Sequence, residues 1–265
     1  MKALFQLLLL ILIFFVAWLG FSQPDYVKIF HLKELSKSTE KKIGDEIVEV
    51  LKKTEQEAGA DSAALVLTNI KNKLLYSNRN IPHDLQLHLI KSNEVNAFAL
   101  PGNHIIVYTG LINQCDSPEE LCGVLAHEMA HLSLNHVMKR LAGEIGITVL
   151  ATVTTGNAQV INQVIKLLSS NAFERKQESE ADAAAVTFLI HSHINPNAFA
   201  GFMDKIANLK KEQPGVMEWI STHPDSHARA ETIRSLIGTT HQAYNPVINP
   251  EEWQLLKHAA GSSGQ

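Results

Sequence analysis

Cysteine is nearly absent from this chain of 265 residues, which contains only Cys115 and Cys122. No CxxC pair and no cysteine–histidine finger spacing occurs, so the sequence argues against a structural zinc site. Cys122 falls inside an expected helix, and a disulfide demands a specific geometry, so we expect two unpaired thiols. A disulfide between them is the alternative in an oxidising compartment.

An excess of basic residues is also missing. The chain has 23 Lys and Arg against 27 Asp and Glu, which gives a formal net charge of −4 and a pI near 6.3. Nucleic-acid binding usually requires a basic surface, so we expect no nucleic-acid partner. Hydrophobic residues make up 45% of the chain, an ordinary globular composition that can bury the core of one domain.

Beyond the N-terminus, no segment approaches 18 uninterrupted apolar residues. Near the start, Lys2 precedes an apolar run over residues 3–19 that only Gln6 interrupts. Residues 1–22 are therefore predicted to be a signal peptide, with a small-x-small cleavage site at residues 20–22, or a retained membrane anchor. Because Lys2 marks the inner side of the membrane, the rest of the chain is expected outside the cytoplasm.

The remaining chain is predicted to form one main domain. Residues 23–37 are predicted to be a linker, residues 38–240 the domain, and residues 241–265 a C-terminal extension with a partly disordered end. Hydrophobic periodicity and capping signals predict helices over 38–57, 61–76, 117–138, 158–169, 173–191, 195–211 and 226–236, and strands over 84–90, 95–100 and 104–108. The expected fold class is α+β and mainly helical, with a small antiparallel sheet packed on the helix over 117–138.

Two local features add to this picture. The turn residues Pro101, Gly102 and Asn103 predict a hairpin between the last two strands. Residues 141–169 are largely apolar, and core packing is the simpler interpretation because the run is too short to span a bilayer. A lid or a segment that dips into a membrane is the alternative for the same residues.

The helix over 117–138 carries the motif with the clearest chemistry. His127 and His131 are one helical turn apart and project from the same face, so both imidazoles can bind one zinc ion. Glu128 can reach a water on that zinc, whose pKa falls toward ~7, and can take its proton during attack on a peptide carbonyl. Two core histidines bonded to neighbouring groups are the alternative, but buried ionisable residues need a partner and a metal provides one.

A catalytic zinc needs a third protein ligand and an open position. His136 on a continuous helix would point a third of a turn or more away from His131, so we interpret it as a helix-end histidine. Glu178 and Asp182 are four residues apart on a later helix: Glu178 can bind the zinc, and Asp182 can bond the far nitrogen of a ligating histidine. Glu180 is expected to face elsewhere, and a solvated acidic helix face is the alternative for this cluster.

Taken together, several segments resemble the HtpX, Oma and CaaX-prenyl-protease group of gluzincin peptidases, most closely its small soluble or membrane-tethered bacterial members. The matching segments lie in the family's order and spacing within about residues 38–237: 96–102, 108–111, 125–131, Arg175 with 178–182, and 222–224 with Arg229. The chain departs from the pattern at Asn103, where many members have glycine. It also lacks the multiple membrane spans of HtpX and the C-terminal helical repeats of the periplasmic chaperone-proteases.

The resemblance implies a zincin-like metallopeptidase domain that binds one Zn²⁺ per chain. It implies His127, His131 and Glu178 as ligands of the zinc, and Glu128 as the general base. Manganese or cobalt is the alternative metal in vitro, since the same ligand types accept both.

The resemblance also implies how substrate is bound and how the site is regulated. An edge strand containing Asn96, Ala97, Phe98 and Ala99 would pair with an extended substrate backbone, which gives broad specificity. In some relatives the histidine that corresponds to His223 approaches the zinc and latches the enzyme inactive. In an active form, His223 or Arg229 would stabilise the oxyanion, and the alternative is that both only brace the last helix.

The function implied is zinc-dependent endoproteolysis of unfolded or extended polypeptide during protein quality control in the cell envelope. The expected location is the periplasm or the periplasmic face of the inner membrane, with membrane attachment if the N-terminal segment is not cleaved. Two alternatives stay open at this point. One is a latched, chaperone-like envelope assembly factor with little proteolysis, and the other is a zinc-stabilised binding protein without activity.

Overall fold

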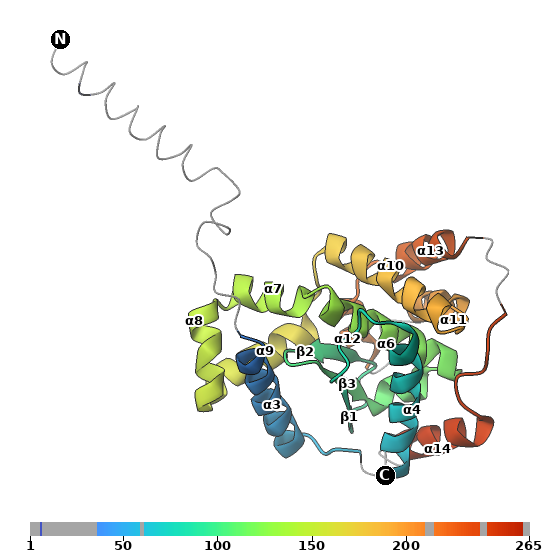
Figure 1. Ribbon diagram of the computed structural model, residues 1–265, viewed down its shortest axis with the longest axis horizontal. Coiled ribbons are helices and arrows are strands. Elements are labelled where there is room, and N and C mark those ends of the chain that lie inside the picture. The colour runs from blue at the N-terminus through green and yellow to red at the C-terminus, as the bar shows by residue number, and fades with distance from the viewer. Residues whose placement is uncertain (1–5, 7–35, 59–60, 210–214, 239–242, 262–265) are drawn as a thin grey trace. The chain divides into compact units, whose positions relative to one another are not determined.

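The computed structural model describes residues 6, 36–58, 61–209, 215–238 and 243–261 (Figure 1). The chain divides into two units, Met1–Ser36 and Lys37–Gln265. Nearly all of the predicted signal or anchor segment and of the predicted linker, and the end of the chain from residue 262, lie outside the described residues. Among the described residues, no helix is both long enough and apolar enough to cross a membrane.

The unit that begins at Lys37 is a mainly helical α+β fold, as predicted. Its elements in chain order are α3 (Lys37–Thr54), α4 (Asp61–Ser77), β1 (Gln86–Ile90), β2 (Ala97–Leu100), β3 (His104–Tyr108), α5 (Thr109–Gln114), α6 (Pro118–Ser133), α7 (His136–Glu144), α8 (Ile147–Leu150), the 3-10 helix η1 (Ala151–Thr155), α9 (Ala158–Ser170), α10 (Arg175–His191), α11 (Asn197–Asn208), α12 (Val216–Thr222), α13 (Ser226–Ile237) and α14 (Pro250–Gly261).

The three strands form one sheet in the order β1-β3-β2. β2 and β3 form the predicted antiparallel hairpin, with Ala97 opposite Val107 and Leu100 opposite His104. β1 runs parallel to β3. The sheet is therefore mixed, and the prediction of a wholly antiparallel sheet was wrong. The alternation of side chains identifies a strand but not its direction, which here depends on how the chain between β1 and β2 places the hairpin.

Helix α6 lies at the centre of the fold, where it packs against β2, α10 and α11 (Figure 1). Residues Leu121 to His131 of α6 are all buried, so this helix is apolar on nearly every side. Gly123 permits the close approach of α11, because a Cβ at this position would lie 2.5 Å from the Cβ of Phe199. The motif residues are therefore held inside the core and not at its surface.

The predicted helix over 117–138 is two helices. α6 ends at Ser133, and Asn135 adopts a left-handed conformation with φ of 59° before α7 begins at His136. Asparagine is one of the few residues that adopts this conformation at low cost. Periodicity did not reveal the break because α7 continues the pattern of apolar residues in a new direction.

The helices α5, α8, α12 and α14 and the 3-10 helix η1 were not predicted. α14 follows the predicted domain end at residue 240 and packs against α4 and α5. Lys257 of α14 donates hydrogen bonds to the carbonyl groups of Ile112, Asn113 and Cys115 at the C-terminal end of α5. α14 thus satisfies carbonyls that the end of a helix leaves without intrahelical partners.

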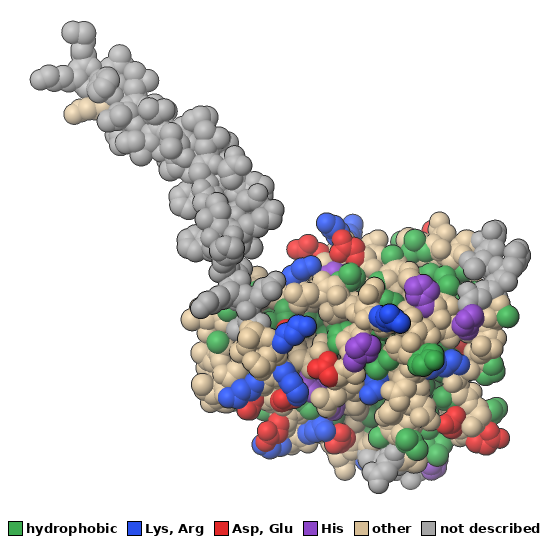
Figure 2. All heavy atoms as spheres, in the orientation of Figure 1, with side chains coloured by type: hydrophobic (Ala, Val, Ile, Leu, Met, Phe, Trp, Pro, Cys, Tyr) green, Lys and Arg blue, Asp and Glu red, His purple; other side chains and the backbone are tan. Residues whose placement is uncertain are grey.

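Core packing is the interpretation that the structure favours for much of the apolar segment 141–169. One face of α9 is buried, and α9 packs against α3 and β2. Both cysteines are buried and free, as expected, and burial raises the pKa of each thiol above its usual range. On the face shown in Figure 2, positive and negative side chains are interspersed among the described residues.

Candidate metal centre and active site

The two motif histidines point their Nε2 atoms at the same place. Ser117 caps α6 by accepting a hydrogen bond from Glu120 N–H, and Pro118 is the first helical residue, as predicted. One turn of this helix separates His127 from His131, and their Nε2 atoms are 3.0 Å apart. Both side chains are fully buried. Local helix geometry therefore brings two potential metal ligands together without help from the rest of the fold.

The third candidate ligand comes from α10, which packs along α6. The carboxylate of Glu178 places Oε1 3.4 Å from His131 Nε2 and Oε2 3.6 Å from His127 Nε2. The three residues offer ligand atoms that all lie within 4.8 Å of one another, and all three are buried. The structure thus brings together the two histidines and the carboxylate that the sequence proposed as ligands.

Asp182 fixes the orientation of the first histidine. Its Oδ1 is 3.0 Å from His127 Nδ1, and an ionised carboxylate can only accept a hydrogen bond. His127 therefore carries a proton on Nδ1 and directs Nε2 toward Glu178. This is the contact that the spacing of Glu178 and Asp182 on one helix face predicted.

His136 lies against the second histidine, contrary to its interpretation as a helix-end residue. The break at Asn135 turns the chain back, so that His136 Nδ1 is 3.1 Å from His131 Nδ1. On its other side, His136 Nε2 is 3.2 Å from Glu180 Oε2. Glu180 points away from the candidate ligands, as expected, but it reaches a residue that contacts one of them. Sequence reasoning missed this pair because it assumed an unbroken helix.

The cluster favours a positive charge at its centre. Burial alone would lower the pKa of His127, but hydrogen bonds to Asp182 and Glu178 outweigh burial and raise it to about 9. Burial opposes ionisation of Glu178 too, yet its histidine neighbours hold the pKa of this carboxyl well below its usual range. A site that stabilises a cation in this way fits a divalent metal, which displaces a proton when it binds.

Two buried oxygen atoms at this centre have no hydrogen bond from the part of the chain that the structure describes. They are Oε1 of Glu128 and Oε1 of Glu178, and both are shielded from solvent. A buried carboxylate oxygen without a hydrogen bond is costly unless a cation or water compensates it. Together with two imidazole Nε2 atoms, this donor set suits zinc, which binds histidine nitrogen and carboxylate oxygen.

Arg229 of α13 forms ion pairs with two of the carboxylates of α10, Glu178 and Asp182. It donates to Asp182 from Nε and from Nη2, at 2.8 and 2.7 Å, and its Nη1 is 2.5 Å from Glu178 Oε2. The same Nη2 lies 3.4 Å from His127 Nε2. Arg229 therefore touches a candidate ligand and its supporting carboxylate while it braces α13 against α10.

His223 closes the remaining side of the centre. It lies at the C-terminal end of α12, with Nδ1 3.3 Å from Glu178 Oε2 and Nε2 3.6 Å from Glu128 Oε1. The Trp219 ring lies 4.3 Å from the ring of His223, measured between centroids. His223 is buried, and burial lowers its pKa. It also forms a second potential ligand set with His127 and Glu128.

The predicted substrate-binding strand is β2, at one edge of the sheet. Tyr108 N–H bonds Asn96 O, so the alternation of an antiparallel ladder directs the backbone groups of Ala97 and Ala99 away from β3. Ala99 N–H donates to Glu128 Oε2 at 3.0 Å, which orients the candidate base.

This edge is covered in the structure. Asn96, Ala97, Phe98 and Ala99 are all buried. The side chain of Asn96 donates to Ser169 O at the end of α9, and the backbone of Val95 bonds Gly215 just before α12. An incoming strand can pair with β2 only after the segments around α9 and α12 move aside.

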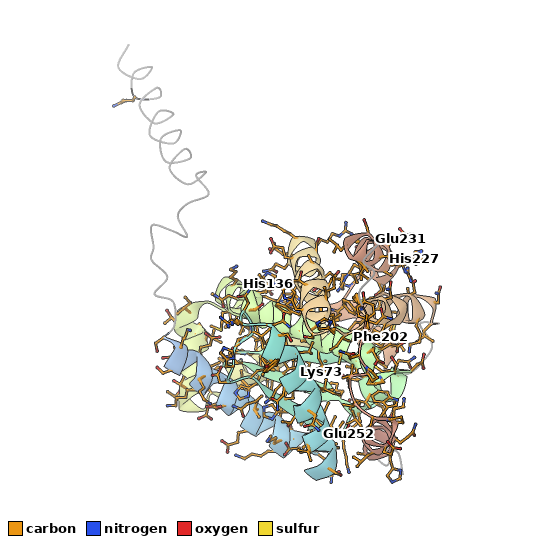
Figure 3. All side chains as sticks on the ribbon, turned by 45° about the vertical axis from the view of Figure 1, so that its right-hand side comes forward. Lys73, His136, Phe202, His227, Glu231 and Glu252 are labelled. Carbon is orange, nitrogen blue, oxygen red and sulfur yellow. The ribbon has the colours of Figure 1, made fainter. Side chains whose placement is uncertain are left out.

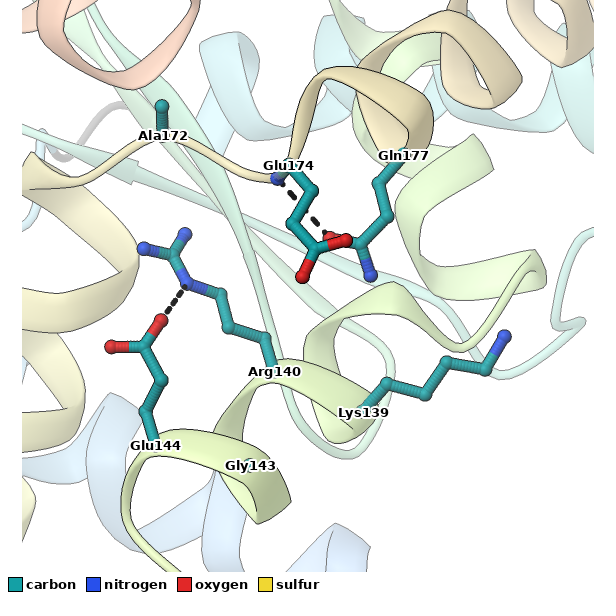
Figure 4. Close-up of a pocket in the computed structure, with 7 residues that line it drawn as sticks. All are labelled: Lys139, Arg140, Gly143, Glu144, Ala172, Glu174 and Gln177. Atoms are coloured by element: carbon teal, nitrogen blue, oxygen red, sulfur yellow. Dashed lines mark hydrogen bonds and ion pairs between the residues drawn. The ribbon is translucent and has the colours of Figure 1, made fainter. Parts of the chain in front are cut away.

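A hollow of about 340 Å³ lies between α7 and the start of α10 (Figure 4). Its lining mixes both charges: Lys139, Arg140 and Glu144 come from α7, and Glu174 precedes α10. It contains none of the candidate ligands, so it is separate from the metal centre. A second hollow adjoins the candidate metal centre, because Glu178, Asp182 and Arg229 contribute to its lining.

Comparison with known proteins gives one family and several named relatives. The model of peptidase family M48 matches residues 61–237. Metalloprotease LoiP of Escherichia coli is 30% identical over 215 residues, which cover 77% of this chain and 83% of LoiP. Mitochondrial metalloendopeptidase OMA1 of Schizosaccharomyces pombe is 27% identical over 152 residues, or 56% of this chain and 45% of that protein.

A further relative is the β-barrel assembly-enhancing protease of Yersinia pestis. It is 25% identical over 184 residues, which cover 64% of this chain and 38% of the relative. The chain therefore spans less than half the length of two of these three relatives.

Proposed function

The chain belongs to peptidase family M48, and on this basis we propose that it is a zinc-dependent endopeptidase. The family match agrees with the resemblance drawn from the motif segments. The observation that carries the proposal is the buried convergence of His127, His131 and Glu178 beside Glu128. The relatives named as metalloendopeptidases support the same reaction for this chain.

The proposed ligands of the zinc are His127, His131 and Glu178. When bound, zinc lowers the pKa of a water ligand to about 7 and polarises a peptide carbonyl. Glu128 supplies the base: Ala99 N–H holds its Oε2, while Oε1 has no hydrogen bond and is free to accept a proton. Burial raises the pKa of Glu128 to about 7, which suits a group that takes a proton from water and returns it to the leaving amine.

The proposed substrate is an extended or misfolded polypeptide. The outward backbone groups of Ala97 and the outward carbonyl of Ala99 support this, since they can pair with a substrate strand of almost any sequence once the covering segments move aside. The proposed setting is the cell envelope, where the enzyme would serve protein quality control. Support comes from the N-terminal apolar run and from a relative whose name refers to β-barrel assembly.

A second candidate function, a latched assembly factor with little proteolysis, is favoured by one observation. His223 contacts both Glu178 and Glu128 on the side where a water and a substrate carbonyl would have to lie. In this form His223 is hydrogen-bonded to the third ligand and lies next to the base. The two functions are compatible if movement of His223 converts one form into the other.

Metal removal tests the proposed activity. We expect the purified chain to cleave casein, an unfolded protein, and a chelator to abolish the cleavage because the base alone cannot activate water at neutral pH. Adding Zn²⁺ back in stoichiometric amount should restore the activity, whereas Mg²⁺ should not because it prefers oxygen ligands. Cleavage that continues at full rate in the chelated protein would contradict the proposal.

His223→Ala tests the latch. We expect cleavage of casein to rise, because a hydrogen bond to a charged group, such as the one between His223 and Glu178, is worth about 1.5–3 kcal/mol. That energy corresponds to a roughly 10- to 150-fold change in the population of the open form. The matched control is His227→Ala, since His227 is an exposed histidine of the next helix. If His223→Ala instead loses activity, His223 takes part in catalysis and the latch is wrong.

A further inference from the structure

We propose that His136, backed by Glu180, is a positioning residue that holds His131 ready to bind the metal. This inference rests on the proposed function, because it assigns a role to residues that support the same centre. The evidence is the line of contacts from Glu180 through His136 to His131. For His131 Nε2 to keep the lone pair that binds a metal, the proton in each of these two hydrogen bonds can be placed in only one way.

The direction of each hydrogen bond follows from the carboxylate. Glu180 accepts, so His136 Nε2 carries a proton and donates it across 3.2 Å. A neutral imidazole has one protonated nitrogen, so Nδ1 of His136 is a bare acceptor. His131 must then donate from its own Nδ1 across 3.1 Å, which leaves Nε2 of His131 with a lone pair. That lone pair lies 3.0 Å from His127 Nε2, at the centre of the cluster.

The two histidine ligands thus obtain the same tautomer by different routes. His127 donates directly to Asp182, whose side chain is buried and is held by Arg229. Among the described residues no carboxylate lies against Nδ1 of His131, and His136 provides the acceptor instead. The side chain of Glu180 is 46% exposed, so water can replace part of its contribution, whereas water has no access to the buried contact between the imidazoles.

The surroundings of His131 fix its ring as well as its tautomer. The ring stacks on Phe173, with 4.0 Å between centroids and 19° between planes. The guanidinium of Arg140 lies over the same Phe173 ring at 4.8 Å from its centroid, and Arg140 is held by Glu144 and by the carbonyl of Asn171. Stacking sets the plane of the His131 ring, but only His136 determines which nitrogen carries the proton.

Three substitutions of His136 separate the hydrogen bond from the packing. His136→Phe keeps a ring but removes the acceptor. His136→Asn places an amide oxygen near the position of Nδ1 and restores the acceptor, while His136→Gln places its polar group near Nε2 and does not. The matched control is His227→Phe, which removes another histidine paired with a carboxylate, Asp204. Figure 3 labels His136 near α7, and His227 beside Glu231 on α13.

The measurement is the zinc affinity of the metal-depleted full-length chain, determined by competition with a chelator of known affinity. Thermal unfolding of each metal-depleted variant reports separately on the fold. We expect His136→Phe and His136→Gln to bind zinc 10- to 100-fold more weakly, the usual effect of removing a group that supports a metal ligand. His136→Asn should stay within about threefold of the unsubstituted chain, and His227→Phe should not differ.

The outcomes distinguish this inference from the proposed function. Unchanged zinc affinity in His136→Phe, or an equal loss in His136→Asn and His136→Gln, would overturn the role of the hydrogen bond while wild-type zinc binding and cleavage stand. If the phenylalanine variant does not fold, the comparison of asparagine with glutamine decides, since both are polar. If the unsubstituted chain binds no zinc, the proposed function itself fails.

Discussion

Glu128→Gln is expected to reduce casein cleavage to background while leaving zinc bound. A positioned general base contributes about 10²–10⁴-fold to the rate, and the amide of glutamine cannot take a proton from water. The substitution is nearly isosteric, and the amide oxygen can still accept the hydrogen bond from Ala99 N–H. The fold and the metal ligands should therefore be preserved, so the loss should appear in kcat.

The measurement is kcat and KM on an unfolded substrate, together with the zinc content of the same preparation. Glu119→Gln is the matched control, because Glu119 lies in the first turn of the same helix, remote from the metal centre, and should leave both quantities unchanged. A zinc-stabilised binding protein without activity makes Glu128 dispensable. If the substituted chain retains its cleavage rate, the assignment of Glu128 as the base is wrong.

Arg229→Met is expected to have the largest effect on stability, a loss of about 3–5 kcal/mol. Arg229 is the cation that faces two buried carboxylates, and it bonds Asp182 twice and contacts Glu178. Methionine fills similar space but leaves both buried carboxylates without the guanidinium, so that only the neighbouring histidines offset their negative charge. Breaking a buried ion pair by removing one partner costs far more than losing an exposed pair, because the remaining charge cannot be hydrated.

The control is Arg234→Met on the same helix. Arg234 is half exposed and pairs with Asp204, so its removal should cost at most about 1 kcal/mol. Urea unfolding of the metal-depleted chains gives both values, and depletion matters because zinc would otherwise compensate Glu178. Equal losses in the two variants would show that Asp182 and Glu178 do not depend on Arg229, and the proposed charge balance at the centre would be wrong.

Much of the candidate site could be predicted from the sequence because it depends on local helix geometry. A separation of four residues places His127 beside His131, and the same separation places Glu178 and Asp182 on one face of α10. The chemistry of the residue types then assigns a role to each side chain, since imidazole and carboxylate groups suit zinc. The predicted contact of Asp182 with a motif histidine is present in the structure for this reason.

The direction of strand pairing and the burial of β2 could not be predicted from the sequence, because both depend on the path of the chain between elements. The parallel pairing of β1 with β3 follows from the connection between strands, which side-chain alternation does not encode. The contacts of Asn96 with the end of α9 and of Val95 with Gly215 join residues more than 70 positions apart. A strand can be identified as an edge from sequence, but its exposure depends on what packs over it.

The sequence by itself determined the metal-binding motif, the helix of each proposed ligand and the mainly helical fold class, because each follows from periodicity within one element. Only the tertiary structure decided which groups surround those ligands. One residue, Asn135, breaks the helix and returns His136 to His131, and α12 brings His223 against Glu128. These contacts arise from the packing of separate helices around a buried charge, where position depends on the whole core and no local pattern records it.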